Sequence, residues 1–171
     1  MYMREEMPDD AIAISRLTTA AFAAAEHASG TEATIVERLR ATGALTLSLV
    51  AQANDGAIVG HIAFSPVTIA SDGGGAVTDW FGLGPVSVLP EHQGAGIGAA
   101  LVCEGLERLA AIGAQGCVVL GDPDYYCRFG FIGDAGPRYP GPPAEYFQAR
   151  GFGSHAIPQG VVRYHPAFGV E

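Results

Sequence analysis

Residues 83–98 read Leu-Gly-Pro-Val-Ser-Val-Leu-Pro-Glu-His-Gln-Gly-Ala-Gly-Ile-Gly, an apolar strand followed by a loop that has almost no side chains. A helical pattern begins directly after this loop. The first turn of a helix carries unpaired N–H groups and a partial positive charge. A loop without Cβ atoms lets an anion approach those groups closely. The stretch therefore predicts a phosphate or pyrophosphate site, or, in the simpler interpretation, only a sharp turn from strand into helix.

Length and composition limit the class of protein. A chain of 171 residues can bury one full core, so we expect a single domain over residues 1–171. No apolar run is long enough to span a membrane, and Met1–Pro8 lacks the apolar segment of a signal peptide, which favours a cytoplasmic protein. Nine arginines, no lysine and a net charge of −9 argue against binding to nucleic acid or to an anionic membrane.

The cysteines do not indicate a metal site. Cys103, Cys117 and Cys127 match no zinc pattern, and an odd number does not suit a set of disulfides. We expect them to be buried structural thiols and expect no metal.

Helical and strand patterns alternate along the chain. Pro85 removes a backbone donor, and Gly82 and Gly84 favour a bulge, so the strand that contains them should lose one neighbour near its end. The expected elements are helices at 8–25, 31–43 and 97–111, a hairpin of strands 45–53 and 57–69, a strand at 77–88, a parallel strand at 116–120, a short helix from Asp122 to Gly130, a helical turn at 144–149 and a last strand at 160–168.

The crossover from strand 77–88 through the helix to strand 116–120 brings two loops together. Parallel strands end at the same edge of a sheet, where ligands of open α/β sheets bind. The glycine loop and the segment after Leu120, which contains Tyr125 and Tyr126, should therefore face one site.

Gly94–Ala99 also fits the dinucleotide-binding pattern G-x-G-x-x-G/A, with Asp122 at a suitable distance for a ribose. In that motif the first glycine follows the strand directly and usually opens the domain. Here Leu89–Gln93 intervenes and more than eighty residues come first, so this interpretation is disfavoured. A P-loop is excluded because it requires a lysine.

Two ordered motifs resemble those of the GNAT superfamily of N-acetyltransferases. Gln93, Gly96 and Gly98 match its acyl-coenzyme A (CoA) loop, Gln/Arg-x-x-Gly-x-Gly/Ala, and Tyr126–Phe131 matches Tyr-x-x-x-Gly-Phe. The resemblance covers nearly the whole chain. Gly121-Asp122-Pro123 and Tyr164–Phe168 are similar to a bacterial subgroup of uncharacterised, predicted acetyltransferases.

The resemblance implies an α+β (mixed α/β) GNAT-like domain. Its sheet would be mixed and mostly antiparallel, with roughly six or seven strands split between strands 4 and 5 and about four flanking helices. It also implies acetyl-CoA as cosubstrate and acetyl transfer to a primary amine of a small molecule or peptide, by direct attack.

Cofactor binding would rest on backbone groups. Amides of the loop would bind the pyrophosphate, and one strand would pair with the pantetheine arm as if with another strand. Ala95 departs from many relatives, which have Lys or Arg there. The implied cofactor-binding residues are Val86, Val88, Gln93, Gly94, Ala95, Gly96, Gly98 and Ala99.

Tyr126 is the general acid by its position in the family motif, with packing beside the phenylalanines as the alternative. Asp79, His61 and Asp122 are the candidate bases. His61 is more simply a satisfied core histidine, Asp79 the solvent-side end of a strand and Asp122 a helix cap.

A different class of function is a non-catalytic acyl-CoA sensor or regulatory domain, against which Tyr126 argues. Whether the chain forms a homodimer, and which acyl group and amine it uses, stay open. The acceptor pocket is expected from the N-terminal helices, the turn at 71–77 and the loop at 137–153.

Overall fold

A computed structural model describes residues 1–23, 25 and 28–169. The described chain forms two compact units. Unit 1 contains Met1–Ser65, Gly84–Gly105 and the described residues from Pro166 on; unit 2 contains Pro66–Leu83 and Leu106–His165. Within the described ranges, every helix is too short or too polar to cross a membrane.

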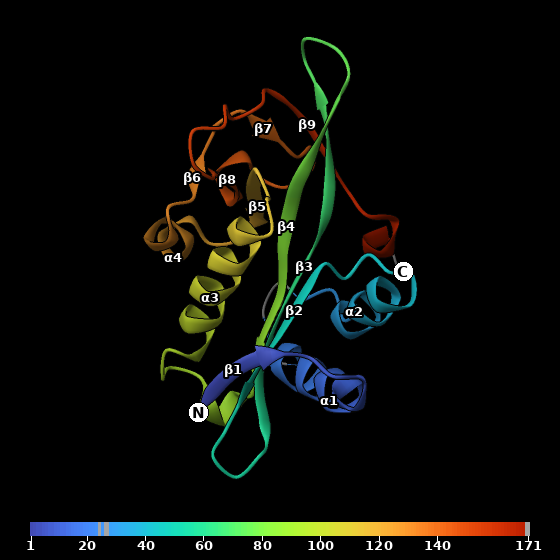
Figure 1. The fold of residues 1–171 in the computed structure, drawn as a ribbon, viewed down its shortest axis with the longest axis vertical. Coiled ribbons are helices and arrows are strands. Elements are labelled where there is room, and N and C mark those ends of the chain that lie inside the picture. The colour runs from blue at the N-terminus through green and yellow to red at the C-terminus, as the bar shows by residue number, and fades with distance from the viewer. Residues whose placement is uncertain (24, 26–27, 170–171) are drawn as a thin grey trace. The chain divides into compact units, whose positions relative to one another are not determined.

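Figure 1 labels the helices and strands along the chain. The helices are α1 (Ala11–Phe22), α2 (Glu32–Ala41), α3 (Ile97–Ala111) and α4 (Pro123–Tyr126). The strands are β1 (Tyr2–Glu5), β2 (Leu47–Gln52), β3 (Ile58–Ser71), β4 (Ala76–Val88), β5 (Gly116–Leu120), β6 (Ile132–Gly133), β7 (Pro137–Arg138), β8 (Phe147–Gly151) and β9 (Gly160–Tyr164).

The strands form one mixed sheet in the order β1-β2-β3-β4-β5-β8-β6, and β9 pairs with both β3 and β7. The pairing of β4 with β5 is parallel and covers only Trp80–Gly82 against Gly116–Val118. It stops before Pro85, as expected for a residue without an N–H donor. The predicted mixed sheet, split between strands 4 and 5, is confirmed. Its described strands number nine, because β1 and the two-residue strands β6 and β7 also join.

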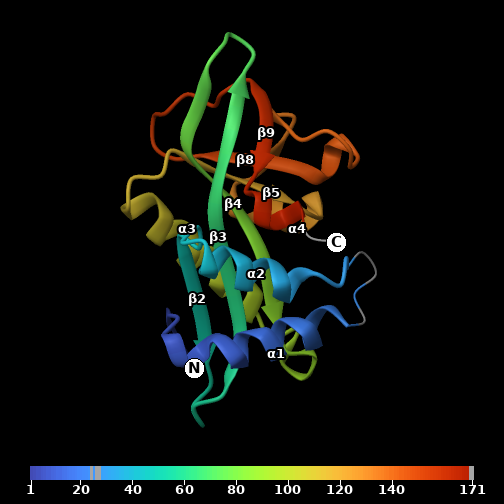
Figure 2. The same ribbon diagram turned by 90° about the vertical axis from the view of Figure 1, so that its right-hand side faces the viewer.

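In unit 1, helices cover both faces of the strands. Ile14 of α1 and Val36 of α2 pack on Val50 of β2, and Figure 2 shows these two helices side by side on that face. On the other face, a Cβ atom at Gly60 would lie 2.9 Å from Cγ2 of Ile97. The glycine in β3 thus lets α3 approach the sheet closely.

Unit 2 has its own apolar core between its strands. Its buried members are Val67, Ile69, Trp80, Val118, Phe147, Ala149 and Val162. Two glycines make room for aromatic rings there: Gly116 lies under the indole of Trp80, and a Cβ at Gly82 would lie 2.7 Å from Cε1 of Tyr164. Aromatic packing therefore requires glycine at these strand positions.

Several predicted elements differ from the structure. The first α-helix begins after a 3₁₀ turn (Pro8–Asp10) and ends at Phe22 rather than Ala25, and part of the predicted extension lies outside the described residues. The turn at 144–149 is helical only over Ala144–Tyr146, because the next residues pair with β5 as β8. The last strand stops at Tyr164, since Pro166 starts another 3₁₀ turn.

The cysteine prediction is partly wrong. Cys117 is buried in β5, but Cys103 and Cys127 are exposed, and all three are free thiols. Cys103 lies on the outer face of α3, and Cys127 lies on the short segment that follows Tyr126. Neither position belongs to an apolar core, which explains the difference.

Candidate functional site

The glycine loop presents bare backbone beside open space in unit 1. Gly94 and Gly96 have φ values of 79° and 84°, and a Cβ atom on either would meet no atom within 4 Å. The first N–H groups of α3, from Ile97 on, have no acceptor within the helix. These free donors, together with the positive end of the helix dipole, fit a bound pyrophosphate.

Two hydrogen bonds fix the path of the chain into this loop. The Gln93 side chain donates from Nε2 to the Val88 carbonyl at 3.0 Å, and the Leu89 N–H donates to the Val59 carbonyl at 3.0 Å. Gln93 therefore holds the loop against the end of β4. Its side-chain amide is therefore engaged, and its backbone N–H donates to the Pro90 carbonyl at 3.3 Å.

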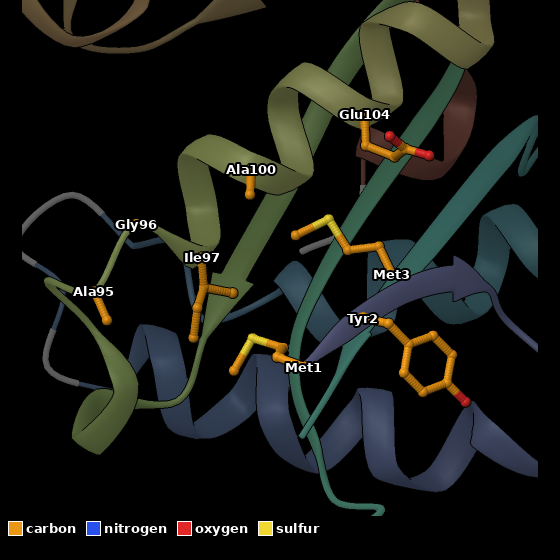
Figure 3. A pocket seen from close by; sticks show the side chains of 8 residues that line it. All are labelled: Met1, Tyr2, Met3, Ala95, Gly96, Ile97, Ala100 and Glu104. Carbon is orange, nitrogen blue, oxygen red and sulfur yellow. The ribbon is translucent and has the colours of Figure 1, made fainter. Parts of the chain in front are cut away.

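A pocket of about 450 Å³ opens beside the loop. Figure 3 shows the side chains of Met1, just before β1, and of Met3 in β1 next to the start of α3. The lining residues are Met1, Tyr2, Met3, Ala95, Gly96, Ile97, Ala100 and Glu104. The sequence interpretation missed the contribution of β1, because these N-terminal residues belong to no motif and show no clear alternation.

Val86 and Val88 lie on the part of β4 that follows its pairing with β5. Both are half-buried and alternate with the buried Pro85 and Ser87. Ser87 donates from Oγ to Oγ1 of Thr18 in α1 at 3.4 Å. A strand end that has lost its neighbour on one side can pair there with the amides of an extended ligand.

Tyr126 lies in unit 2, at the end of the short helix α4. The Asp122 carboxylate caps α4 by accepting the Asp124 N–H at 2.9 Å, so the predicted cap is confirmed. The Tyr126 ring makes edge contacts with Tyr125 and Phe131, at centroid distances of 5.0 and 5.9 Å. Burial raises the pKa of Tyr126 to about 12, so the phenol keeps its proton at neutral pH.

The backbone next to Tyr126 is held by β8. A Cβ atom at Gly121 would lie 2.5 Å from Cε2 of Tyr126. The Gly121 N–H donates to the Tyr146 carbonyl at 2.8 Å, and Nε2 of the buried Gln148 donates to the Gly121 carbonyl at 3.2 Å. The sequence interpretation missed Gln148, because β8 is too short and too polar to be recognised before its pairing with β5 is known.

His61 lies in unit 1 and is fully buried. Its Nε2 is 2.7 Å from Oγ of Ser48, which also donates to Glu6, and Glu6 pairs with Arg40 at 2.8 Å. Because the Ser48 hydroxyl proton goes to the carboxylate, His61 is assigned as the donor from Nε2, and its buried Nδ1 has no partner in the described chain.

The buried network around His61 determines its charge. Burial and the nearby Arg40 lower the pKa of His61 to about 4, despite the opposing effect of Glu6. The imidazole is therefore neutral at pH 7. This arrangement is typical of a core histidine, and its role as a base stays a prediction.

Asp79 is exposed in β4 and has a φ of 65°, which is unusual for a residue other than glycine. Its carbonyl accepts the Gln115 N–H at 2.8 Å, just before the start of β5. Tyr126 follows the other end of β5. The six residue steps from Gln115 to Gly121 span roughly 20 Å of extended chain. Its role as a base stays a prediction as well.

Within the described ranges, no three His, Cys, Asp or Glu side chains are placed to hold a metal ion. Tyr125 packs against the ring of Phe129 and under the guanidinium of Arg128.

A mixed sheet split beside its one long crossover helix, with a glycine loop at the start of that helix, defines a GNAT-type fold. The chain belongs to this family: residues 45–132 match the model described as acetyltransferase (GNAT) domain. The predicted family and fold are thereby confirmed, and the dinucleotide-binding alternative is set aside.

The chain is similar over nearly its full length to known bacterial proteins. It is 37% identical over 174 residues to the uncharacterized N-acetyltransferase YhbS of Escherichia coli K12, covering 98% of each chain. It resembles the crystal structure of a GNAT family acetyltransferase from Brucella melitensis in complex with acetyl-CoA, at 50% identity and a TM-score of 0.84, covering 98% of this chain and 97% of that one.

The E. coli YhbS structure in complex with CoA superimposes with a TM-score of 0.85, at 37% identity, over 99% of this chain and 92% of that one.

Proposed function

We propose that this protein, as one domain over residues 1–171, is an acetyl-CoA-dependent N-acetyltransferase that acts on a primary amine of a small molecule or peptide. The observation that carries the proposal is the bare backbone of Gly94 and Gly96, which faces open space and leads directly into α3. The crystal structures of two similar proteins, which hold acetyl-CoA or CoA, support it.

Backbone groups would hold the cosubstrate. N–H groups of the loop from Gln93 to Ala99 would bind the pyrophosphate, mainly those after Gln93, whose own N–H donates to Pro90. Backbone groups of Val86 and Val88 would pair with the amides of pantetheine. Ala95 offers no cation, so affinity rests on amides and on the helix dipole.

Tyr126 would act as the general acid. The acceptor nitrogen forms a bond to the acetyl carbon of the thioester by direct attack, and the C–S bond breaks. Tyr126 gives its proton to the departing sulfur and regains one from solvent, while the acceptor nitrogen loses a proton. With a pKa of about 12, the phenol is present as the acid throughout the physiological range.

A base must also take the proton that the amine loses. His61 and Asp79 are the two candidates considered, since the Asp122 carboxylate already caps α4, and a chain of water molecules leading to solvent is the alternative. The burial of His61 and the position of Asp79 at the far end of β5 both favour the water chain.

The test combines binding and turnover. Calorimetry measures the affinity of the protein for CoA, with NAD⁺ as the control ligand. Thiol release from acetyl-CoA is then followed with amines, polyamines, amino acids, aminoglycosides and peptides. CoA binding with amine-dependent thiol release supports the enzyme. Binding without turnover on any acceptor favours the acyl-CoA sensor, and no CoA binding overturns both.

A further inference from the structure

Unit 2 contains a second pocket, of about 300 Å³, formed between β7 and the start of β8. Its walls are mainly apolar and include Tyr139, Phe147 and three prolines, with Asp134 and Arg138 at its border. It shares no lining residue with the pocket beside the glycine loop.

The aromatic wall of this pocket is packed against the core of unit 2 before any ligand binds. Phe147 is 4% exposed and belongs to the core of unit 2. The Tyr139 ring packs on it at a centroid distance of 5.7 Å and meets the Tyr164 ring edge-on at 5.1 Å. Prolines fix φ on the rest of the wall. A flat apolar group can therefore enter without a large ordering cost.

The two charged residues at the border are not equivalent. Both terminal nitrogens of Arg138 donate to the Asp72 carboxylate at 2.8 Å, which compensates its charge. Asp134 is exposed and has no ion pair in the described part of the chain. Its φ of 54° holds a non-glycine residue in the left-handed region. The pocket thus carries one uncompensated negative charge next to two aromatic rings, a combination that suits a cation.

The pocket adjoins the support of Tyr126 through the sheet. Phe147 pairs with Leu120 in the β5–β8 register, and the next residue, Gly121, contacts the Tyr126 ring. A molecule in the pocket therefore lies at the same end of β5 as the proposed general acid.

We propose that this pocket binds the far end of the acceptor, and that the acceptor is a diamine-like molecule with a second positive charge on an apolar body. This rests on the proposed N-acetyltransferase function. The second cation lies between Asp134 and the aromatic wall, and the reacting primary amine extends from the pocket toward the end of β5.

Three probes each contain a benzene ring with one aminomethyl group: 4-(aminomethyl)benzylamine, benzylamine and 4-(aminomethyl)benzoate. Opposite this group they carry a second aminomethyl group, a hydrogen atom and a carboxylate, respectively. Calorimetry or NMR titration without CoA measures the affinity of the protein for each. We expect the diamine to bind about fivefold tighter than benzylamine, and the carboxylate to bind weakest. Asp134→Asn should abolish this order of affinities, and Tyr139→Leu should weaken the binding of all three probes.

Glu145→Gln is the matched control, because it removes the same charge from a residue that lies in the turn between β7 and β8 and does not line the pocket. It should leave the order of the probes unchanged. Equal affinities for the three probes, an order that Asp134→Asn preserves, or no binding at the highest soluble concentration would each overturn the proposal. Calorimetry with CoA on the same samples separates the two proposals: lost CoA binding contradicts the N-acetyltransferase, whereas a failed probe order with intact CoA binding contradicts only the acceptor pocket.

Discussion

Gly121 lies so close to Tyr126 that a Cβ atom on it would stand 2.5 Å from Cε2 of the tyrosine ring. Real Cβ atoms do not approach other atoms this closely, so the ring keeps its present place only because residue 121 is glycine. The backbone of Gly121 is itself held by Tyr146 and by the buried Gln148. The position of the proposed acid thus depends on β8.

Gly121→Ala should displace the Tyr126 ring and reduce kcat by about 10²-fold, because misplacing a catalytic group by about 1 Å has such effects. The Kd of CoA should stay the same. Steady-state kinetics and calorimetry measure the two quantities. Gly133→Ala is the control, since a Cβ there meets its nearest atom at an ordinary 3.9 Å. Equal kcat in both variants would contradict a positioning role for Gly121.

Tyr126→Phe should lower turnover by about 10²-fold with little change in CoA affinity, since it removes the proton donor and keeps the ring. Tyr125→Phe should be nearly neutral. Because burial raises the pKa of Tyr126 to about 12, its ionisation should not reduce kcat of the wild type between about pH 7 and 10. Unaltered turnover in Tyr126→Phe would remove the phenol from the mechanism.

Gly96→Val should abolish CoA binding, because the side chain would fill the space that the loop backbone faces. A valine at a φ of 84° also costs about 1–2 kcal/mol in backbone strain. Gly113→Val is the control, because it introduces similar backbone strain, at a φ of 96°, just after the other end of α3. Calorimetry should show CoA binding in the Gly113 variant alone. Retained affinity in Gly96→Val would refute the loop assignment.

Acid should destabilise the protein through His61. Its pKa is lowered from 6.5 to about 4 by burial, so the unfolded chain binds this proton more strongly than the folded one. Stability is then complete above about pH 6.5 and falls as the pH drops toward 4, by up to about 3 kcal/mol. Urea unfolding at several pH values measures this loss.

The exchange of His61 isolates its share of that pH dependence. His61→Gln should flatten the curve between about pH 6.5 and 4, whereas His155→Gln, on an exposed loop, should leave it steep. Burial also raises the pKa of Glu6, but hydrogen bonds from Arg40 and Ser48 lower it overall. The contribution of Glu6 to stability is therefore lost only as the pH falls below the ordinary pKa range of a glutamate. An identical slope in His61→Gln would contradict this origin.

Elements with a strong local pattern could be predicted from sequence. The spacing of Val102, Leu106 and Leu109, with Gly113 after them, predicts α3 within its observed bounds, and all three side chains are buried. Asn54-Asp55-Gly56 predicts the β2–β3 hairpin in the same way. The Asp122 cap follows from local chemistry as well. In each case neighbouring residues supply the stabilising contacts.

Elements that depend on distant partners could not be predicted. β8 contains Gln148 and Arg150 and shows little β-pattern, yet its pairing with β5 makes it a strand. β1 exists through β2, about fifty residues away. Short strands gain most of their stability from cross-strand contacts, so their own residues carry little signal.

The sequence by itself determined the family, the glycine loop and the choice of Tyr126 as the candidate general acid. These follow from local motifs, because the backbone conformation that each motif needs is supplied by its own glycines and by the helix end next to it. Only the tertiary structure decided that Gly121 and Gln148 hold Tyr126, that His61 is buried in a network with Ser48 and Glu6, and that Asp134 borders an aromatic pocket. Those relationships join residues far apart in the chain, and their energies depend on burial and distance, which arise only when the strands pair.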